Sequence, residues 1–508
     1  MSSVRLRHVK CGEEKPGCSQ CARSGRKCDG YTDASQNQLH HALVKAAPRQ
    51  GWSPRPDRNI VLVPGTREER HYVQFFCTQT AHALSGFFPS DFWNQFLPQL
   101  SHRNPAVRHA VAAVGALHQC QLQGRLISPS TPRSTENHEF ILQQYNKAIR
   151  QFLQQMGNPA DMKIDMMLIQ CVLFICLEML NGNTKQAMDH VQGGLQILSR
   201  QLQDQQIAAQ RSFDRDLFQF FYRQNIQLSY FGRRLMPFMD TASKDFPVLP
   251  PNENVFFDNI DQARDCLTSL TTRGLSFIRA VQERTWRVPR GQVSEQQLDQ
   301  QSALLAELKA WFSAFEAMQK KSARTIGILD PRAPLSLLCQ YYAAVTWLRS
   351  CTFLDERNFD RFYPNFEKIV SAGERVVQAS AQDEPNLSTE HFFLDADVLP
   401  VLYWAIMHCR HPILRRRALT ALENYPAREG LWERRTHVAV ARRYIELEET
   451  AVAHLPVEQR LVAERNLIYD AAILPEMEAP LNPCPVLFRL KPDGPDAPWD
   501  ERWENLSW

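Results

Sequence analysis

The stretch from Cys11 to Tyr31 reads CGEEKPGCSQCARSGRKCDGY, with its cysteines spaced C-x6-C-x2-C-x6-C. Glycine, proline and charged residues separate the thiols, so this segment cannot build a hydrophobic core and needs disulfides or a metal as a staple. The C-x2-C pair favours a metal, because it can place two thiolates on one tetrahedral centre. We therefore predict a metal site with Cys11, Cys18, Cys21 and Cys28 as ligands, and disulfide pairing is the alternative.

The flanking motifs extend this pattern. They are RLRHVKC over residues 5–11, K-P-x-C-x2-C over 15–21 and G-R-x-C-x-G-Y over 25–31. Together they resemble the fungal binuclear zinc cluster transcription factors, in which six cysteines spaced C-x2-C-x6-C-x6-C-x2-C-x6-C hold two zinc ions. The resemblance implies zinc as the cofactor. The last four cysteines keep every spacing of the family, whereas Met1 and Val4 stand at the positions of the first two.

Three explanations for this departure stay open. A wrong start codon or a missed upstream exon would leave the module truncated, since everything from Arg5 onward is intact. The module could instead be degenerate and no longer bind two metals. A third reading is a single zinc ion held by the four cysteines that are present, because a mononuclear site can still fold part of a small module.

The basic residues before Cys11 are the predicted DNA contacts. By resemblance, Arg5 to Cys11 forms a short helix that enters the major groove of double-stranded DNA. Arg7 and His8 occupy the family's base-reading positions; Arg7 suits guanine, whereas His8 is a weaker reader and leaves a strict CGG preference open. Arg5 and Lys10 suit phosphate contacts, which position the protein without specifying a sequence. A solvated basic face is the alternative.

Charge is unevenly distributed along the 508 residues. The net charge is +3, yet residues 1–70 carry 13 Lys/Arg and 7 Asp/Glu, a net +6, so the remainder carries −3. A basic N-terminal segment followed by a nearly neutral body indicates a polyanionic partner at the N-terminus.

Residues 32–64 contain several prolines and are predicted to form a linker. The linker has too few apolar repeats to form a coiled coil, so the oligomeric state stays open.

Residues 65–475 show helical periodicity, and we expect an all-α fold: the small cysteine module followed by a large helical domain. Asn104 and Pro105 signal a helix start, and Gly193-Gly194 indicates a close helix contact. No alternating apolar and polar stretch is long enough to predict a sheet. Helices are expected at about 68–84, 105–117, 136–156, 162–180, 184–200, 211–231, 258–283, 296–319, 334–353, 365–380, 396–411, 413–424 and 435–451.

This body resembles the fungal-specific transcription factor domain. The resemblance is carried by residues 87–93, 104–110, 145–149, 409–419 and 426–432.

Residues 476–508 form a proline-rich tail, whose last part, from Asp493, holds five acidic residues, one arginine and three tryptophans. The tail could be an activation segment, or its tryptophans could dock on the helical body.

Other features argue against secretion, membrane insertion and catalysis. No secretory signal follows Met1, and the most apolar run, Met166 to Leu177, is too short to span a bilayer, so we expect a soluble intracellular protein. No nucleotide-binding, zinc-protease or serine-hydrolase motif occurs, so an enzyme is not expected. Arg415 to Arg417 could form a basic patch, but a mixed packed and solvated role is favoured.

The predicted function is a nuclear, zinc-dependent, sequence-specific DNA-binding regulator of RNA polymerase II transcription, with DNA and the transcription machinery as partners. The alternative is a helical regulator that has lost DNA binding and acts through protein or small-molecule binding.

Overall fold

The chain divides into two compact units, Met1–Asn59 and Ile60–Trp508, and the structure, a computed structural model, describes residues of the second. The predicted zinc-cysteine module and nearly all of the linker therefore lie outside the described residues. The described ranges are 64–123, 135–157, 164–203, 215–233, 235–236, 255–287, 293–322, 330–353, 356–383, 392–473, 482–494 and 497–508.

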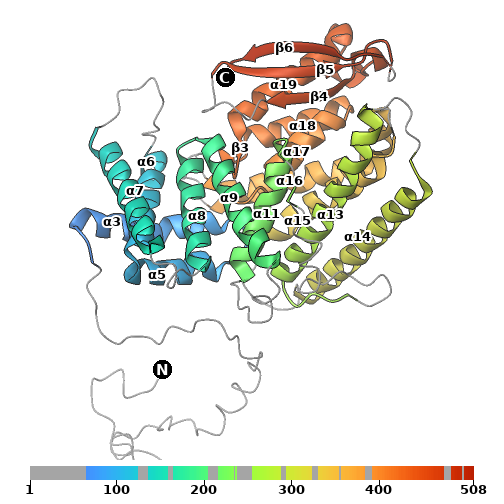
Figure 1. Ribbon diagram of the computed structural model, residues 1–508. Coiled ribbons are helices and arrows are strands. Elements are labelled where there is room, and N and C mark those ends of the chain that lie inside the picture. Colours follow the sequence, from blue (N-terminus) through green and yellow to red (C-terminus); the bar gives the residue numbers. More distant parts are fainter. Residues whose placement is uncertain are drawn as a thin grey trace, which may run out of the picture. The chain divides into compact units, whose positions relative to one another are not determined.

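Helices dominate the first half of this unit (Figure 1). Thr66 caps the first helix through a capping box with Glu69, and Asn104 caps α6 by accepting a 3.2 Å hydrogen bond from the N–H of Val107, as its sequence predicts. The elements are α3 (Arg67–Phe75), η2 (Phe76–Thr80), α4 (Ala81–Ser85), η3 (Phe92–Phe96), α5 (Leu97–Arg103), α6 (Pro105–Leu122), α7 (Thr135–Met156), α8 (Ile164–Leu180), α9 (Thr184–Gln203) and α11 (Arg215–Tyr230).

The second half adds longer helices and small strands. A short sheet joins β1 to β2 in parallel and β2 to β3 in antiparallel orientation. The elements are α13 (Ile260–Arg287), α14 (Glu295–Ser322), α15 (Arg332–Ser350), η5 (Glu356–Phe362), α16 (Tyr363–Asp383), β1 (Phe392–Phe393), α17 (Leu399–His408), α18 (Pro412–Glu423), β2 (Arg428–Glu429), β3 (Trp432–Glu433), α19 (Arg434–Glu449), η6 (Thr450–Val452), η7 (Val457–Gln459) and η8 (Glu464–Asn466).

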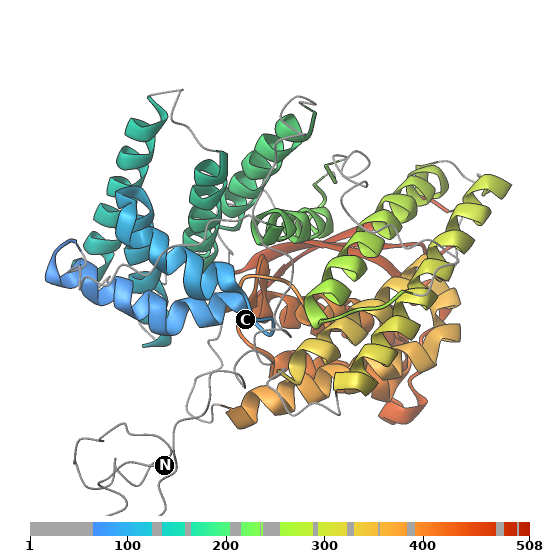
Figure 2. The ribbon, with the colours of Figure 1, turned by 90° about the horizontal axis from the view of Figure 1, so that it is seen from below.

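A three-stranded antiparallel sheet, which was not predicted, follows α19; the described body is otherwise mainly helical, as expected for the all-α class. Its strands are β4 (Ile468–Ile473), β5 (Cys484–Leu490) and β6 (Asp500–Leu506), in that order. Figures 1 and 2 show the sheet in red at the C-terminal end of the described chain. The central strand packs into the helical core, where Val486 and Phe488 are fully buried. Trp503 on the edge strand is 55% exposed.

Helix α8 is apolar over the 18-residue window Ile164–Asn181, which is long and apolar enough to cross a membrane by length and composition, so the expectation that this run is too short was wrong on length. In this structure 67% of that window is buried among the other helices, as expected for a core helix.

The two adjacent glycines of α9, Gly193 and Gly194, differ in the space around them. A Cβ on Gly194 would overlap the ring of Phe221, which confirms a close helix contact, whereas a Cβ on Gly193 would meet nothing within 4 Å.

Candidate functional site

All residues predicted for the metal and DNA site precede the described ranges. The predicted ligands Cys11, Cys18, Cys21 and Cys28 and the predicted DNA contacts Arg5, Arg7, His8 and Lys10 therefore stay predictions. In the described residues, no group of three or more His, Cys, Asp or Glu side chains could hold a metal ion.

The helical body contains a cavity of about 390 Å³. Helices α11, α13, α15 and α17 line it together with residues 395–397 and the beginning of β4. Protein interiors leave few voids larger than a water molecule, and small-molecule sites fall in the range of roughly 300–1,000 Å³. The cavity is thus the candidate functional site in the described part of the chain.

A buried ion-pair cluster forms one wall of the cavity. Asp395 accepts hydrogen bonds from Nε of Arg223 at 3.0 Å and from Nη2 of Arg264 at 2.6 Å. Burial alone would raise the pKa of Asp395, but the two guanidinium groups outweigh it and lower that pKa. Asp397 lies 3.8 Å from Arg264 and accepts a 3.1 Å hydrogen bond from Gln340; burial raises its pKa.

Glu429 holds the chain segment that carries these aspartates. Its Oε2 accepts hydrogen bonds from the backbone N–H groups of Asp397, Val398 and Leu399 at 3.0, 2.9 and 2.8 Å, and its Oε1 accepts one from the hydroxyl of Tyr425. These amides lie where the chain enters α17, with Val398 as the N-cap and Leu399 as the first helical residue, so Glu429 pairs N–H groups that have no partner within the helix; burial and the nearby Asp397 raise the pKa of Glu429 to about 8. Glu429 therefore fixes one edge of the cavity.

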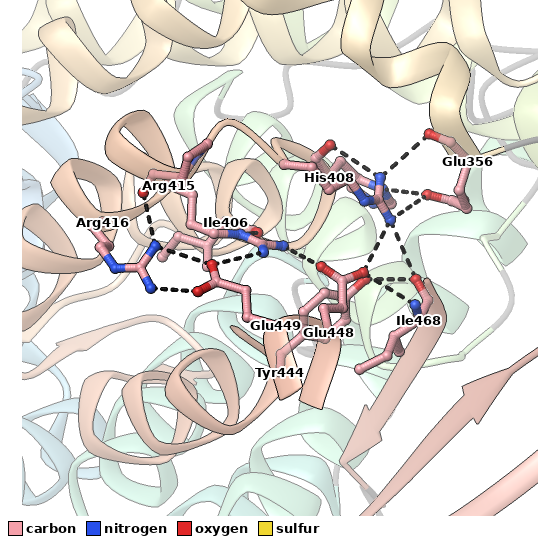
Figure 3. A network of polar contacts seen from close by, with 11 residues as sticks. Glu356, Ile406, His408, Arg415, Arg416, Tyr444, Glu448, Glu449 and Ile468 are labelled. Carbon is pink, nitrogen blue, oxygen red and sulfur yellow. Dashed lines mark hydrogen bonds and ion pairs between the residues drawn. The ribbon is translucent and has the colours of Figure 1, made fainter. Parts of the chain in front are cut away.

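A second polar network, shown in Figure 3, borders the cavity, whose lining includes Glu356 and His408. His408 Nδ1 lies 3.1 Å from Oε2 of Glu356, and Nη2 of Arg410 lies 3.2 Å from the same oxygen. Arg410 also donates to Oε1 of Glu448 at 3.5 Å and to the carbonyl of Ile468 at 3.4 Å. The network thus ties the end of α17 to η5, α19 and β4.

Aromatic rings also line the cavity. The ring centroids of Trp347 and Trp404 are 6.0 Å apart, and those of Tyr230 and Trp347 are 6.5 Å apart in a stacked arrangement. Trp432 adds contacts to Tyr230 at 6.0 Å and to Tyr403 at 5.8 Å. The cavity therefore offers flat apolar surfaces to a guest.

This cavity was not predicted from the sequence. Its polar wall joins Arg223 to Asp395 across 172 positions and Arg264 to Asp395 across 131, so no local motif carries it. A weak signal was present at Gly274, since a glycine inside a helical pattern often has a packing or functional reason.

Comparison with known proteins supports both predicted parts of the chain. Residues 5–38 match the model of the fungal Zn(2)-Cys(6) binuclear cluster domain, whose metal is zinc. The aspercryptin biosynthesis cluster-specific transcription regulator atnN of Emericella nidulans is 30% identical over 335 residues, which cover 62% of this chain and 53% of that protein. Transcription regulator lscL of Purpureocillium lilacinum is 26% identical over 199 residues, covering 38% of this chain and 47% of that protein.

The chain thus spans about half the length of these curated relatives. No solved structure matches it significantly. Residues 70–326 match the model of the fungal specific transcription factor domain. Since this match covers half of the 508 residues, the chain belongs to the fungal specific transcription factor domain family.

Proposed function

We propose that this protein is a nuclear, zinc-dependent regulator of RNA polymerase II transcription that binds specific DNA sequences. One observation carries the proposal: the four cysteines keep the family spacing directly after a basic segment, within the part of the chain that matches the zinc cluster domain. The two relatives described above are named as transcription regulators. This family consists of transcription regulators and is not a class of enzymes, and the proposal includes no catalytic step.

The donor set decides how much zinc the module can hold. Structural zinc sites are closed tetrahedra of four ligands, so Cys11, Cys18, Cys21 and Cys28 suit one such centre. Bound zinc would supply folding free energy to a segment without a hydrophobic core. The folded segment would then present Arg7 and His8 to base edges and Arg5 and Lys10 to phosphates.

DNA binding by the full chain tests the proposal. Fluorescence anisotropy with a duplex carrying CGG and with a scrambled duplex should show tighter binding to the first. Removal of zinc by a chelator, or Cys18→Ser, should abolish this difference. Cys77→Ser is the matched control, because Cys77 lies in the helical body outside any metal-ligand group of the described residues. Equal affinity of all forms for both duplexes would overturn the proposal.

The second candidate function is that of a regulator that acts through its helical body and does not bind DNA. The body contains a cavity of about 390 Å³. This observation favours a helical regulator that acts through protein or small-molecule binding. A zinc-loaded full chain that fails to prefer the CGG duplex would support this candidate over the first.

A further inference from the structure

Gly274 marks a hollow in the interior of the protein. It lies within α13, it is buried, and it lines the cavity, yet a Cβ built on it would meet nothing within 4 Å. A glycine inside a helix destabilises it relative to alanine, and a buried position normally packs against neighbours. At this position a side chain would enter space that is open to a guest.

The charged groups around the hollow are already paired with one another. Its four lining carboxylates each lie within 4 Å of a guanidinium: Asp395 and Asp397 near Arg264, Glu356 near Arg410, and Asp470 near Arg489 at 2.8 Å. An ionised guest would lose its hydration and would find no free counter-charge among these groups. The cavity therefore favours an uncharged molecule.

Hydrogen-bond donors on the aromatic walls lack acceptors. The hydroxyl of Tyr403 and the Nε1 atoms of Trp404 and Trp432 are shielded from solvent and have no hydrogen-bond partner among the described residues. All three side chains line the cavity. A buried donor without an acceptor is costly, and a carbonyl or ether oxygen on a guest would provide one once a small shift of the ring opens the donor to the cavity.

We propose that this cavity binds an uncharged, largely apolar small molecule that carries a flat ring system and carbonyl or ether oxygens. The aromatic rings would stack on the ring system, and the unpaired donors would select the oxygens. Tyr230 and Phe353 are the lining side chains with large exposed fractions, 37% and 51%, so the entrance lies beside them. This site is independent of the zinc module and of DNA binding.

Nile red is a suitable probe, because it is uncharged, flat and bears a ring carbonyl. Titration of the full chain should show saturable binding at one site per molecule and quenching of tryptophan fluorescence. The anionic dye 1-anilinonaphthalene-8-sulfonate should not displace it at equal concentration. Equal displacement by the anionic dye would overturn the assigned ligand class.

Two glycine variants distinguish Nile red binding in this cavity from binding to other apolar surfaces of the protein. Gly274→Leu should fill the hollow and weaken Nile red binding by about ten-fold or more. Gly193→Leu is the matched control, since it also replaces a helical glycine with open space around its Cβ, but on α9, away from the cavity lining. It should leave binding unchanged. Unchanged binding in a folded Gly274→Leu protein would refute the site.

Variants that remove a donor but keep an aromatic ring keep the test decisive if the leucine disturbs folding. Tyr403→Phe and Trp432→Phe should weaken Nile red binding roughly three- to ten-fold, the loss expected for a hydrogen bond to the ligand. Because these donors have no partner in the free protein, neither variant should lower the melting temperature by loss of a protein hydrogen bond. Wild-type affinity in both variants would overturn the assigned role of the donors.

Discussion

Nη2 of Arg415 donates a 2.5 Å hydrogen bond to Oε2 of Glu448, and neither side chain has any exposed surface. The pair joins α18 to α19 in the network of Figure 3. Nε of Arg415 also donates to the carbonyl of Ile406 at 3.3 Å. Without Arg415, Glu448 would stay buried and would keep Arg410, 3.5 Å from its other carboxylate oxygen, as a charged partner; breaking a buried pair in this way costs more than the pair itself contributes.

Arg415→Met should therefore lower the free energy of unfolding by about 3–5 kcal/mol. Arg417→Met is the control on the same helix, because Arg417 is 40% exposed and its partner Glu374 is 30% exposed. Exposed pairs contribute about 0–1 kcal/mol. Urea denaturation of both variants should separate them clearly; similar losses in the two would contradict the ranking by burial.

Ionisation of Glu69 should make the free energy of unfolding depend on pH in the acid range. Burial raises its pKa, but hydrogen bonds from Lys147, the backbone N–H of Thr66 and Gln144 outweigh burial and bring the pKa from 4.5 to about 2. A carboxyl group with a lowered folded pKa stabilises the protein above its unfolded pKa, and this stabilisation is lost as pH falls from about 4.5 to about 2.

Glu69→Gln should thus destabilise the protein by about 1–3 kcal/mol at pH 7 and by much less at pH 3. Glu68→Gln, at an exposed position in the same first turn, should change stability by no more than about 0.5 kcal/mol at either pH. Thermal melts of both variants at the two pH values give the comparison. A loss that is the same at pH 7 and pH 3 would show that ionisation of Glu69 is not its cause.

Strand β5 should be a stabilising part of the folded body. Phe488 is fully buried in the larger core cluster, whereas Trp503 on β6 is 55% exposed. Phe488→Ala should cost about 3–5 kcal/mol, and Trp503→Ala less than about 1 kcal/mol. Chemical denaturation followed by circular dichroism measures both. A small effect of Phe488→Ala would indicate that the sheet contributes little to the core.

The helices could be predicted from sequence because a 3.6-residue apolar period is a local signal. The expected helix at 184–200 is Thr184–Gln203, and the one at 211–231 is Arg215–Tyr230. The mixed packed and solvated role predicted for the basic residues 415–417 is confirmed. Arg415 is buried, whereas Arg416 and Arg417 are partly exposed and ion-paired.

The sheet and the cavity were not predicted, for different physical reasons. Strand β6 has the sequence DERWENL, which shows no alternation of apolar and polar residues. Such alternation is expected when one face of a strand is buried, and β6 is largely exposed. In β5, Val486, Leu487 and Phe488 are all buried, and short apolar runs of this kind do not distinguish a strand from a helix. The cavity depends on packing between distant helices and on ion pairs across more than a hundred positions.

A protein made of residues 1–508 should bind no more than one zinc ion. The four cysteines of the module suit one tetrahedral centre, and the described body has no group of side chains that could hold a metal. Metal analysis of the purified chain, with a chelator-treated sample as reference, gives the ratio. Two tightly bound zinc ions per chain would show that ligands beyond Cys11, Cys18, Cys21 and Cys28 take part.

Arg7 and Lys10 should contribute differently to DNA binding. A bidentate contact between arginine and guanine discriminates by roughly 1–3 kcal/mol, so Arg7→Ala should reduce the preference for a CGG duplex over a scrambled one. Lysine on a phosphate acts as a point charge. Lys10→Ala should weaken binding to both duplexes alike and lower the slope of log affinity against log salt by about one unit.

Zinc content is the control for both variants, since a lost metal would unfold the module and weaken all binding. With zinc retained, the ratio of the two affinities reports base reading and the salt slope reports phosphate contacts. If Arg7→Ala and Lys10→Ala both reduce the two affinities by the same factor, neither side chain reads a base. Specificity would then have to come from His8 or from the shape of the DNA, because Arg5 is assigned to phosphate as well.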